Sequence, residues 1–278
     1  MPPGKHPLQS SEQVGLRVSY SSGYRAPQAY NEDLHIEAVG GALALIRLAK
    51  GLKPEYSHSV SASADLYHSF GRLQANLLVE GFYTMLNNVF TLVRIGENED
   101  GSIVYWERRN GSGATVAGVN FEGKIGIPHR FELQLGYTLQ SSRYDTPERW
   151  SDQLAPQRKM FRAPDHYGYL TSLFDITPRF KASLFGTYTG SMLVKHILSD
   201  GTNETDLEQN TPSFWDMGIK LAYTFRIGKA VNLEVNTGVK NIFDAYQKDL
   251  DYGAFKDADY VYGPSLPRMY FVGIKFSI

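Results

Sequence analysis

The sequence predicts an all-β protein: an antiparallel transmembrane β-barrel segment of about ten strands, with short periplasmic turns and long extracellular loops. Three observations carry this prediction. Apolar and polar residues alternate with a period of two, the alternating segments are roughly nine to eleven residues long, and the connections between them are alternately short and long. A tilted strand needs about that many residues to cross a bilayer. The 18 Tyr, 15 Phe and 26 Gly also favour strands and tight turns.

The alternation is clearest in residues 131–140, 215–225 and 231–240. Between Trp215 and Phe225 every odd position is apolar, whereas the even positions hold polar or small residues such as Lys220. Weaker copies cover residues 14–20, 60–66, 73–85, 115–127 and 180–188, and a last one runs from Tyr270 to Ile278. Residues 168–176 form a further segment whose register is ambiguous. The sequence therefore predicts ten strands in one domain, residues 1–278, preceded only by a polar stub at residues 1–12.

The connections between these segments alternate in length along the chain. Short ones are expected at residues 70–72, 128–130, 177–179 and 228–229, and long polar ones at 28–54, 96–113, 145–164, 198–212 and 247–265. This sorting is typical of an outer-membrane barrel. A soluble β-sandwich has no reason to place all its long loops at one end, but it stays open as an alternative.

The two faces of the predicted strands differ in charge. We expect an apolar face that contacts lipid, with Leu135, Trp215, Leu221, Leu233 and Ile274 on it. The opposite face is expected to line a hydrated interior, with side chains that include Gln134, Lys220, Glu234 and Lys275.

Composition excludes several classes of protein. The 28 Lys and Arg balance 29 Asp and Glu, so the chain lacks the basic surplus of a nucleic-acid-binding protein. The absence of Cys excludes disulfides, thiolate zinc sites and a cysteine nucleophile. The sequence contains no run of 18 apolar residues, so it predicts no transmembrane helix. Residues 1–12 do not resemble a secretory signal.

The sequence predicts no catalytic site, no metal site and no cofactor. Asp65 with His68, and Asp165 with His166, could be acid–base pairs, but residues i and i+3 of a strand point to opposite faces. The acidic segment 203–208 offers oxygen ligands without the ordered spacing of a calcium loop. We therefore interpret these residues as solvated groups, and the chain as a non-enzyme.

Short motifs in a shared order resemble the TonB-dependent outer-membrane receptors. They are Gly-Tyr-Arg-Ala-Pro at 23–27 with Asn-Glu-Asp-Leu at 31–34, Leu-Lys-Pro-Glu at 52–55, Phe-Tyr-Thr at 82–84 with Asn-Asn-Val at 87–89, Gly-Val-Asn-Phe-Glu at 118–122, Tyr-Thr-Gly at 188–190 and Val-Lys-Asn-Ile-Phe-Asp at 239–244. The segment from Tyr270 to Ile278 looks like the last strand of such a barrel.

The resemblance implies a function and a set of partners. It implies uptake of a large scarce ligand, such as a ferric siderophore or cobalamin, across the outer membrane of a Gram-negative bacterium. Family barrels have 22 strands, a plug domain and a TonB box. This chain is expected to be the C-terminal part of such a barrel, to contact TonB only through a plug that it lacks, and not to drive energised transport alone. Outer-membrane lipid, and the barrel-assembly machinery through the segment from Tyr270 to Ile278, are further expected partners.

The candidate ligand-binding residues are loop aromatics and one arginine: Arg25, Tyr30, Tyr105, Trp106, Trp150, Tyr252, Tyr260 and Tyr262. Arg25 belongs to the family motif, where it is expected to anchor a loop, and the aromatic residues could instead form an interfacial girdle. Two other functions stay open: a ten-stranded outer-membrane protease of the omptin type, which needs Asp pairs and an Asp–His pair at the extracellular rim, and a soluble β-sandwich binding module.

Overall fold

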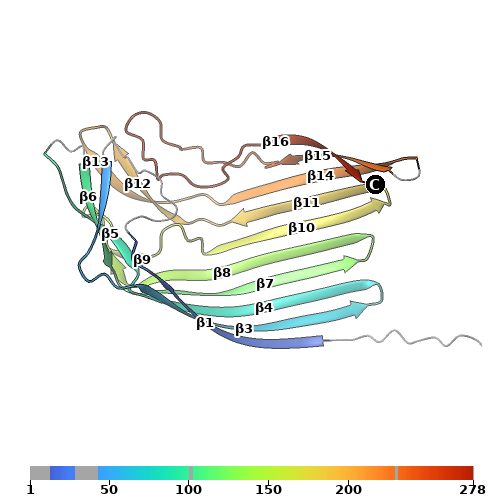
Figure 1. The fold of residues 1–278 in the computed structure, drawn as a ribbon, viewed down its shortest axis with the longest axis horizontal. Coiled ribbons are helices and arrows are strands. Elements are labelled where there is room, and N and C mark those ends of the chain that lie inside the picture. Colours follow the sequence, from blue (N-terminus) through green and yellow to red (C-terminus); the bar gives the residue numbers. More distant parts are fainter. Residues whose placement is uncertain (1–12, 29–42, 100–102, 229–230, 278) are drawn as a thin grey trace, which may run out of the picture.

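The computed structural model describes residues 13–28, 43–99, 103–228 and 231–277. Their regular elements are all strands (Figure 1): β1 (Gln13–Arg25), β2 (Leu43–Leu48), β3 (Glu55–Phe70), β4 (Leu73–Asn87), β5 (Phe90–Glu97), β6 (Ile103–Asn110), β7 (Ala114–Ile127), β8 (Phe131–Glu148), β9 (Gln157–Lys159), β10 (His166–Thr177), β11 (Phe180–Thr189), β12 (Leu193–Ser199), β13 (Glu204–Asn210), β14 (Phe214–Ile227), β15 (Val231–Lys240) and β16 (Met269–Ser277). No helix in the described part of the chain is long and apolar enough to cross a membrane, a result that does not bear on crossing by strands.

Ten strands form one antiparallel sheet in the order β1-β3-β4-β7-β8-β10-β11-β14-β15-β16, and β9 adds a short pairing to β8. The short turns lie at one end of the sheet and the long loops at the other (Figure 1). Both predictions, the strand number and the sorting of the connections, are confirmed. Within the described residues the sheet is open, with β1 and β16 as its edges.

One face of this sheet is apolar from edge to edge. One row across it reads Val14, Leu66, Leu77, Gly123, Leu135, Leu170, Gly186 and Met217, each directly opposite the next. Across these ten strands the apolar face carries Asp, Glu, Lys or Arg only at Arg143 and Asp145, which lie at the long-loop end of β8. Lys220 and Leu221 are consecutive in β14 and so face opposite ways, which confirms the predicted register.

The polar face is the concave one. Side chains from five strands, among them Tyr67, Asn76, Lys124, Glu132 and Asp175, line a single hollow of about 410 Å³ near the short-turn end. Because neighbouring strands are about 4.8 Å apart, β3 and β10 can share one hollow only if the sheet curves toward its polar side. The architecture is that of an open barrel wall.

Glycines on the concave face are covered by aromatic rings of the neighbouring strand. Gly118 lies opposite Phe82, Gly136 opposite Tyr169, Gly218 opposite Phe185 and Gly238 opposite Phe271. In each pair a Cβ atom on the glycine would collide with the ring, so the absent side chain makes room for it. This pairing gives a strand glycine the packing that it lacks by itself.

The predicted loops contain more regular structure than their polarity indicated. The loop after β4 folds into the hairpin β5–β6, with β2 added in parallel to β6, and the loop after β11 folds into the hairpin β12–β13. β8 continues to Glu148, well beyond the predicted end at residue 140. The reason is local: short alternating stretches such as Ile103–Asn110 pair with one another outside the barrel wall, where no lipid selects a strictly apolar face.

Candidate binding surface at the loop end

The loops at one end of the sheet are joined to one another by side-chain contacts. Arg94 of β5 bridges Glu97, at 2.5 Å, and Glu204 of β13, at 3.4 Å. Gln153, between β8 and β9, donates its amide to the backbone oxygen of Glu204 and accepts the N–H of Asp206, so it extends the edge of β13. Two loops far apart in sequence therefore meet on the β12–β13 hairpin.

Trp150 belongs to the same junction. Its indole N–H donates to Glu208 of β13 at 2.9 Å, and its ring meets Phe161 edge to face. The Lys195 ammonium lies 5.2 Å from the Trp150 ring centre and 5.1 Å from that of Phe161. Trp150 thus holds the β8–β10 loop against the β12–β13 hairpin, with part of its surface exposed.

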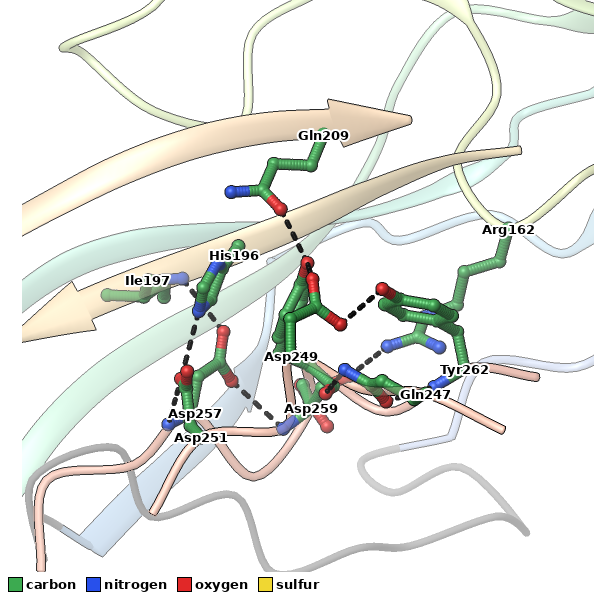
Figure 2. Close-up of polar contacts among 11 residues, drawn as sticks. Arg162, His196, Ile197, Gln209, Gln247, Asp249, Asp251, Asp257, Asp259 and Tyr262 are labelled. Carbon is green, nitrogen blue, oxygen red and sulfur yellow. Dashed lines mark hydrogen bonds and ion pairs between the residues drawn. The ribbon is translucent and has the colours of Figure 1, made fainter. Parts of the chain in front are cut away.

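The loop between β15 and β16 packs on the other side of this hairpin through two buried tyrosines. Tyr260 and Tyr262 are 1% and 8% exposed and form a small core with Val194 and Phe214. Both hydroxyls donate to the Asp249 carboxylate, that of Tyr260 at 2.7 Å, and the Tyr260 hydroxyl also lies 2.5 Å from Gln209 Oε1 (Figure 2). One carboxylate therefore satisfies two phenols in the core of the loop.

These contacts shift the acidities of all three groups. Burial, and then the hydrogen bond to Asp249, raise the pKa of Tyr262 to about 12 and raise the pKa of Tyr260 further still. Burial alone would raise the pKa of Asp249, but the hydrogen bonds from Tyr262 and Tyr260 outweigh it and lower that pKa. The core is therefore held by a carboxylate and two neutral phenols at neutral pH.

A second set of contacts surrounds His196 of β12, whose side chain is buried. Its Nε2 lies 2.9 Å from Asp251 Oδ2, and its ring stacks on Tyr260 with centres 3.5 Å apart (Figure 2). Asp257 accepts the Ile197 N–H at 2.8 Å, and Arg162 donates to the carbonyl oxygens of Asp259 and Val261. The β15–β16 loop is thus fixed to both the β12–β13 hairpin and the β8–β10 loop.

Arg25 ends β1 at the rim of the sheet. Its guanidinium lies 3.5 Å from Glu55 and 5.7 Å from the Phe90 ring centre. Arg108 of β6 is buried nearby and donates to the Gln28 carbonyl at 2.5 Å; burial, and then the charge of Arg25, lower its pKa. Arg25 therefore joins the barrel wall to the β5–β6 hairpin, as expected of a loop anchor.

The predicted binding residues fall into three groups. Tyr30 lies outside the described residues. Arg25, Trp150, Tyr260 and Tyr262 make structural contacts between loops, and the last two are buried by them. The Arg47 guanidinium lies over the Tyr105 ring, 5.0 Å from its centre. Trp106, the next residue in the chain, is partly exposed, and Tyr252 is 84% exposed. Ligand contact stays a prediction for all eight.

The sequence-based analysis missed the groups that organise this end of the molecule. Asp249, His196, Gln153 and Lys195 were not singled out, because each contacts a residue more than ten positions away. The one usable signal was a row of aspartates and tyrosines between residues 244 and 262, too acidic for a strand and too aromatic for a simple linker.

The candidate acid–base pairs and the possible metal ligands lie as follows in the described part of the chain. Asp65 and His68 stand on opposite faces of β3, while Asp165 pairs with Lys159 and His166 with Tyr137. Across the described ranges, no group of three or more His, Asp or Glu could hold a metal ion. Buried His196 pairs with partly exposed Asp251, and their other contacts are with Tyr260 and the Asp257 backbone.

Below the loops, a hollow of about 420 Å³ opens on the concave face. Its walls are Thr187, Thr189, Met192, Phe214 and Asp216 on the barrel side and residues 263–265 on the loop side. Hydroxyl and carboxylate groups face this space from β11 and β14. It lies where the loop end meets the concave face of the sheet.

Comparisons with known proteins give a consistent result. The family described as TonB dependent receptor-like, beta-barrel matches residues 9–242. No curated protein sequence matches. Among solved structures, the ferric-catecholate import receptor Fiu from Escherichia coli K12 is similar with a TM-score of 0.60 and 21% identity, over 97% of this chain and 33% of that one.

Two receptors of Pseudomonas aeruginosa have the same fold. FpvA bound to heterologous pyoverdines gives a TM-score of 0.62 at 15% identity, over 95% of this chain and 31% of FpvA. The ferric enterobactin receptor PfeA gives 0.59 at 16%, over 98% and 38%. The chain therefore spans about a third of the length of the structures that it matches.

Proposed function

Because this chain belongs to the family of TonB-dependent receptor β-barrels, we propose that it forms part of the wall and of the ligand-facing loops of an outer-membrane receptor for ferric siderophores. The family consists of receptors and transporters, and its members are outer-membrane proteins of Gram-negative bacteria. The observation that carries the proposal is a ten-stranded wall, apolar on one face and polar on its concave face, with every long loop at one end. Fiu is a ferric-catecholate import receptor, FpvA is bound to a pyoverdine–iron complex and PfeA is a ferric enterobactin receptor, which favours iron over cobalamin as the cargo.

In this proposal the apolar face contacts outer-membrane lipid, the short turns are periplasmic and the joined loops are extracellular. TonB acts through a plug domain, and the strand from Tyr270 to Ile278 engages the barrel-assembly machinery. Tyr105, Trp106, Trp150 and Tyr252 are the candidate ligand contacts, since each keeps exposed surface among the loops. No described contact favours a protease or a soluble sandwich.

The test is uptake of iron by cells. The complete gene product is expressed in a Gram-negative strain without its own siderophore receptors, and radioactive iron is supplied as catecholate, hydroxamate or pyoverdine complexes. We expect accumulation of at least one complex above the empty-vector control, and its loss in a matched strain without TonB. Accumulation that persists without TonB, or none with any complex, would contradict the proposal.

A further inference from the structure

The concave face carries a series of basic side chains on its C-terminal half. Five consecutive rows of paired residues across β11, β14, β15 and β16 each contain one: from the long-loop end, Lys240, Lys220, Lys181, Lys275 and Arg226. Lys220 lies opposite Ser183 and Gly238, Lys181 opposite Ala222, and Lys275 opposite Glu234. We call these five residues the basic staircase.

The dimensions of the staircase match those of a membrane. Consecutive rows on one face are two residues apart, about 6.7 Å along a strand. Four steps therefore rise about 27 Å, close to the roughly 30 Å of the hydrocarbon core. Lys240 to Lys220 and Lys220 to Lys181 are each one strand and one row apart, about 8 Å and so within the Debye length of about 8–10 Å at physiological salt, whereas Lys181 and Lys275 stand three strands apart, about 16 Å.

Among the residues that the structure describes, three of the five side chains form no ion pair. Lys181 pairs with Asp175 at 3.1 Å. Among the described residues, none forms an ion pair with Lys220, Lys240 or Lys275, although Glu234 stands opposite the last. The Lys240 ammonium lies 6.0 Å from the Phe271 ring centre, and that ring covers Gly238 beside Lys220. These positive charges are not neutralised by the wall itself.

The N-terminal half of the same face has the opposite character. On β1 to β8 it carries six acidic residues, Glu55, Asp65, Glu80, Glu122, Glu132 and Glu148, and three basic ones, Arg17, Arg25 and Lys124. Amides rather than cations approach two of these carboxylates: Asn120 donates to Glu80 at 3.1 Å and Gln134 to Glu122 at 2.8 Å. On β10 to β16 the five basic residues face Asp175, Asp216 and Glu234. On the concave face, the strands from β1 to β8 therefore carry a net negative charge, and the strands from β10 to β16 carry a net positive charge.

We propose that the basic staircase guides an anionic solute along the C-terminal wall, from the loop end to the short-turn end. The hollow of about 420 Å³ leads to it, since Asp216 and Thr187 line that hollow one row above Lys240. At the lower end Asp175, the partner of Lys181, lines the hollow of about 410 Å³. The inference rests on the proposed uptake function and adds the charge of the cargo and the wall that it follows.

The test measures binding of two iron complexes that differ in charge. The protein, as its own gene encodes it, is purified from outer membranes in detergent, and its fluorescence quenching is followed with the anionic tris-catecholate of 2,3-dihydroxybenzoate and with the neutral tris-acetohydroxamate. A unit charge about 4 Å away in a water-like medium changes affinity about fivefold. We expect Lys220→Gln with Lys240→Gln to weaken catecholate binding at least about tenfold, to leave hydroxamate binding unchanged, and to remove most of the salt dependence.

The matched control is Arg17→Gln with Arg72→Gln, the same loss of charge at β1 and the β3–β4 turn, outside the lining of both hollows, which should leave catecholate binding within about twofold. The inference is wrong if the catecholate does not bind saturably, or if both double variants lose catecholate affinity equally. It is also wrong if polyglutamate, and not the catecholate, binds in a way that depends on the two lysines, because that result would indicate an acidic polypeptide as the partner. TonB-dependent uptake of a neutral complex, unaffected by the lysine variants, would leave the proposed function standing and refute the staircase.

Discussion

Replacing Asp249 by alanine should release the β15–β16 loop from the β12–β13 hairpin while the barrel wall stays folded. Asp249 is the shared acceptor of the Tyr260 and Tyr262 hydroxyls, both of which lie in the buried core of the loop. Without the carboxylate, Tyr260 can still turn to Gln209, whereas Tyr262 loses the acceptor that the structure gives it.

The expected cost follows from these contacts. A buried hydroxyl left without a partner costs about 1–3 kcal/mol, and the weakened bond of Tyr260 adds about 1 kcal/mol. We therefore expect the docked loop to lose about 2–4 kcal/mol. Since about 1.4 kcal/mol corresponds to a factor of ten, the open fraction should rise by roughly 30-fold to several hundred-fold.

The rate of limited proteolysis measures this opening, because trypsin can cleave after Lys248 and Lys256 once the β15–β16 loop has separated from the β12–β13 hairpin. Asp152→Ala serves as the charge control, since Asp152 is exposed in another loop. Tyr262→Phe should raise cleavage less than Asp249→Ala, and Tyr252→Phe, at an 84% exposed position, should not raise it. Equal cleavage rates for Asp249→Ala and Asp152→Ala would refute the reasoning that the buried carboxylate holds the loop.

Three further predictions concern the wall and the tyrosine core. Val235→Arg, midway along β15 on the apolar face, should cost about 2–4 kcal/mol in urea unfolding from lipid vesicles, whereas Asn236→Arg on the polar face should cost little. Gly136→Val should collide with the Tyr169 ring and cost about 1–3 kcal/mol, with partial recovery on adding Tyr169→Ala, whereas Gly81→Val meets open space and should be tolerated. Because the pKa of Tyr262 is raised to about 12 from about 10, its contribution to stability should be intact below pH 10 and lost as the pH rises toward 12; an alkaline absorbance titration should lose a late step in Tyr262→Phe.

The barrel wall could be predicted from the sequence because its determinants are local. A period of two, together with a lipid-facing side that tolerates almost no charge, fixes both the strand and its register, as at Lys220 and Leu221. The sorting of long and short connections then gives the order of the strands, since each hairpin pairs neighbours in the chain. The predicted ends of strands were less accurate: β8 continues eight residues further, because residues 141–144 still pair with β7 and Arg143 and Glu148 pair with β9.

The loop assembly could not be predicted in the same way because its determinants are distant contacts. Tyr260 and Tyr252 have similar neighbours in sequence, yet one is buried and the other 84% exposed. What separates them is the Asp249 carboxylate and the stacked His196 ring, which only the folded loop brings to Tyr260. Aromatic residues in a loop therefore indicate a candidate binding surface without telling an anchor from a free contact.

The junction of three loops on β13 also constrains how this surface can change over evolutionary time. Glu204 accepts Arg94 of one loop through its carboxylate and Gln153 of another through its backbone carbonyl, so a substitution there breaks the ion pair to Arg94 directly, while a shift of its backbone disturbs both loops. The exposed turn at residues 200–203 is held by hydrogen bonds to its own Asp200, and its contact with another loop is at Gly201, which leaves room for the Phe255 ring. Immune or phage pressure should therefore diversify the tips of these loops freely, while the residues that join them can be exchanged only as a set inherited together.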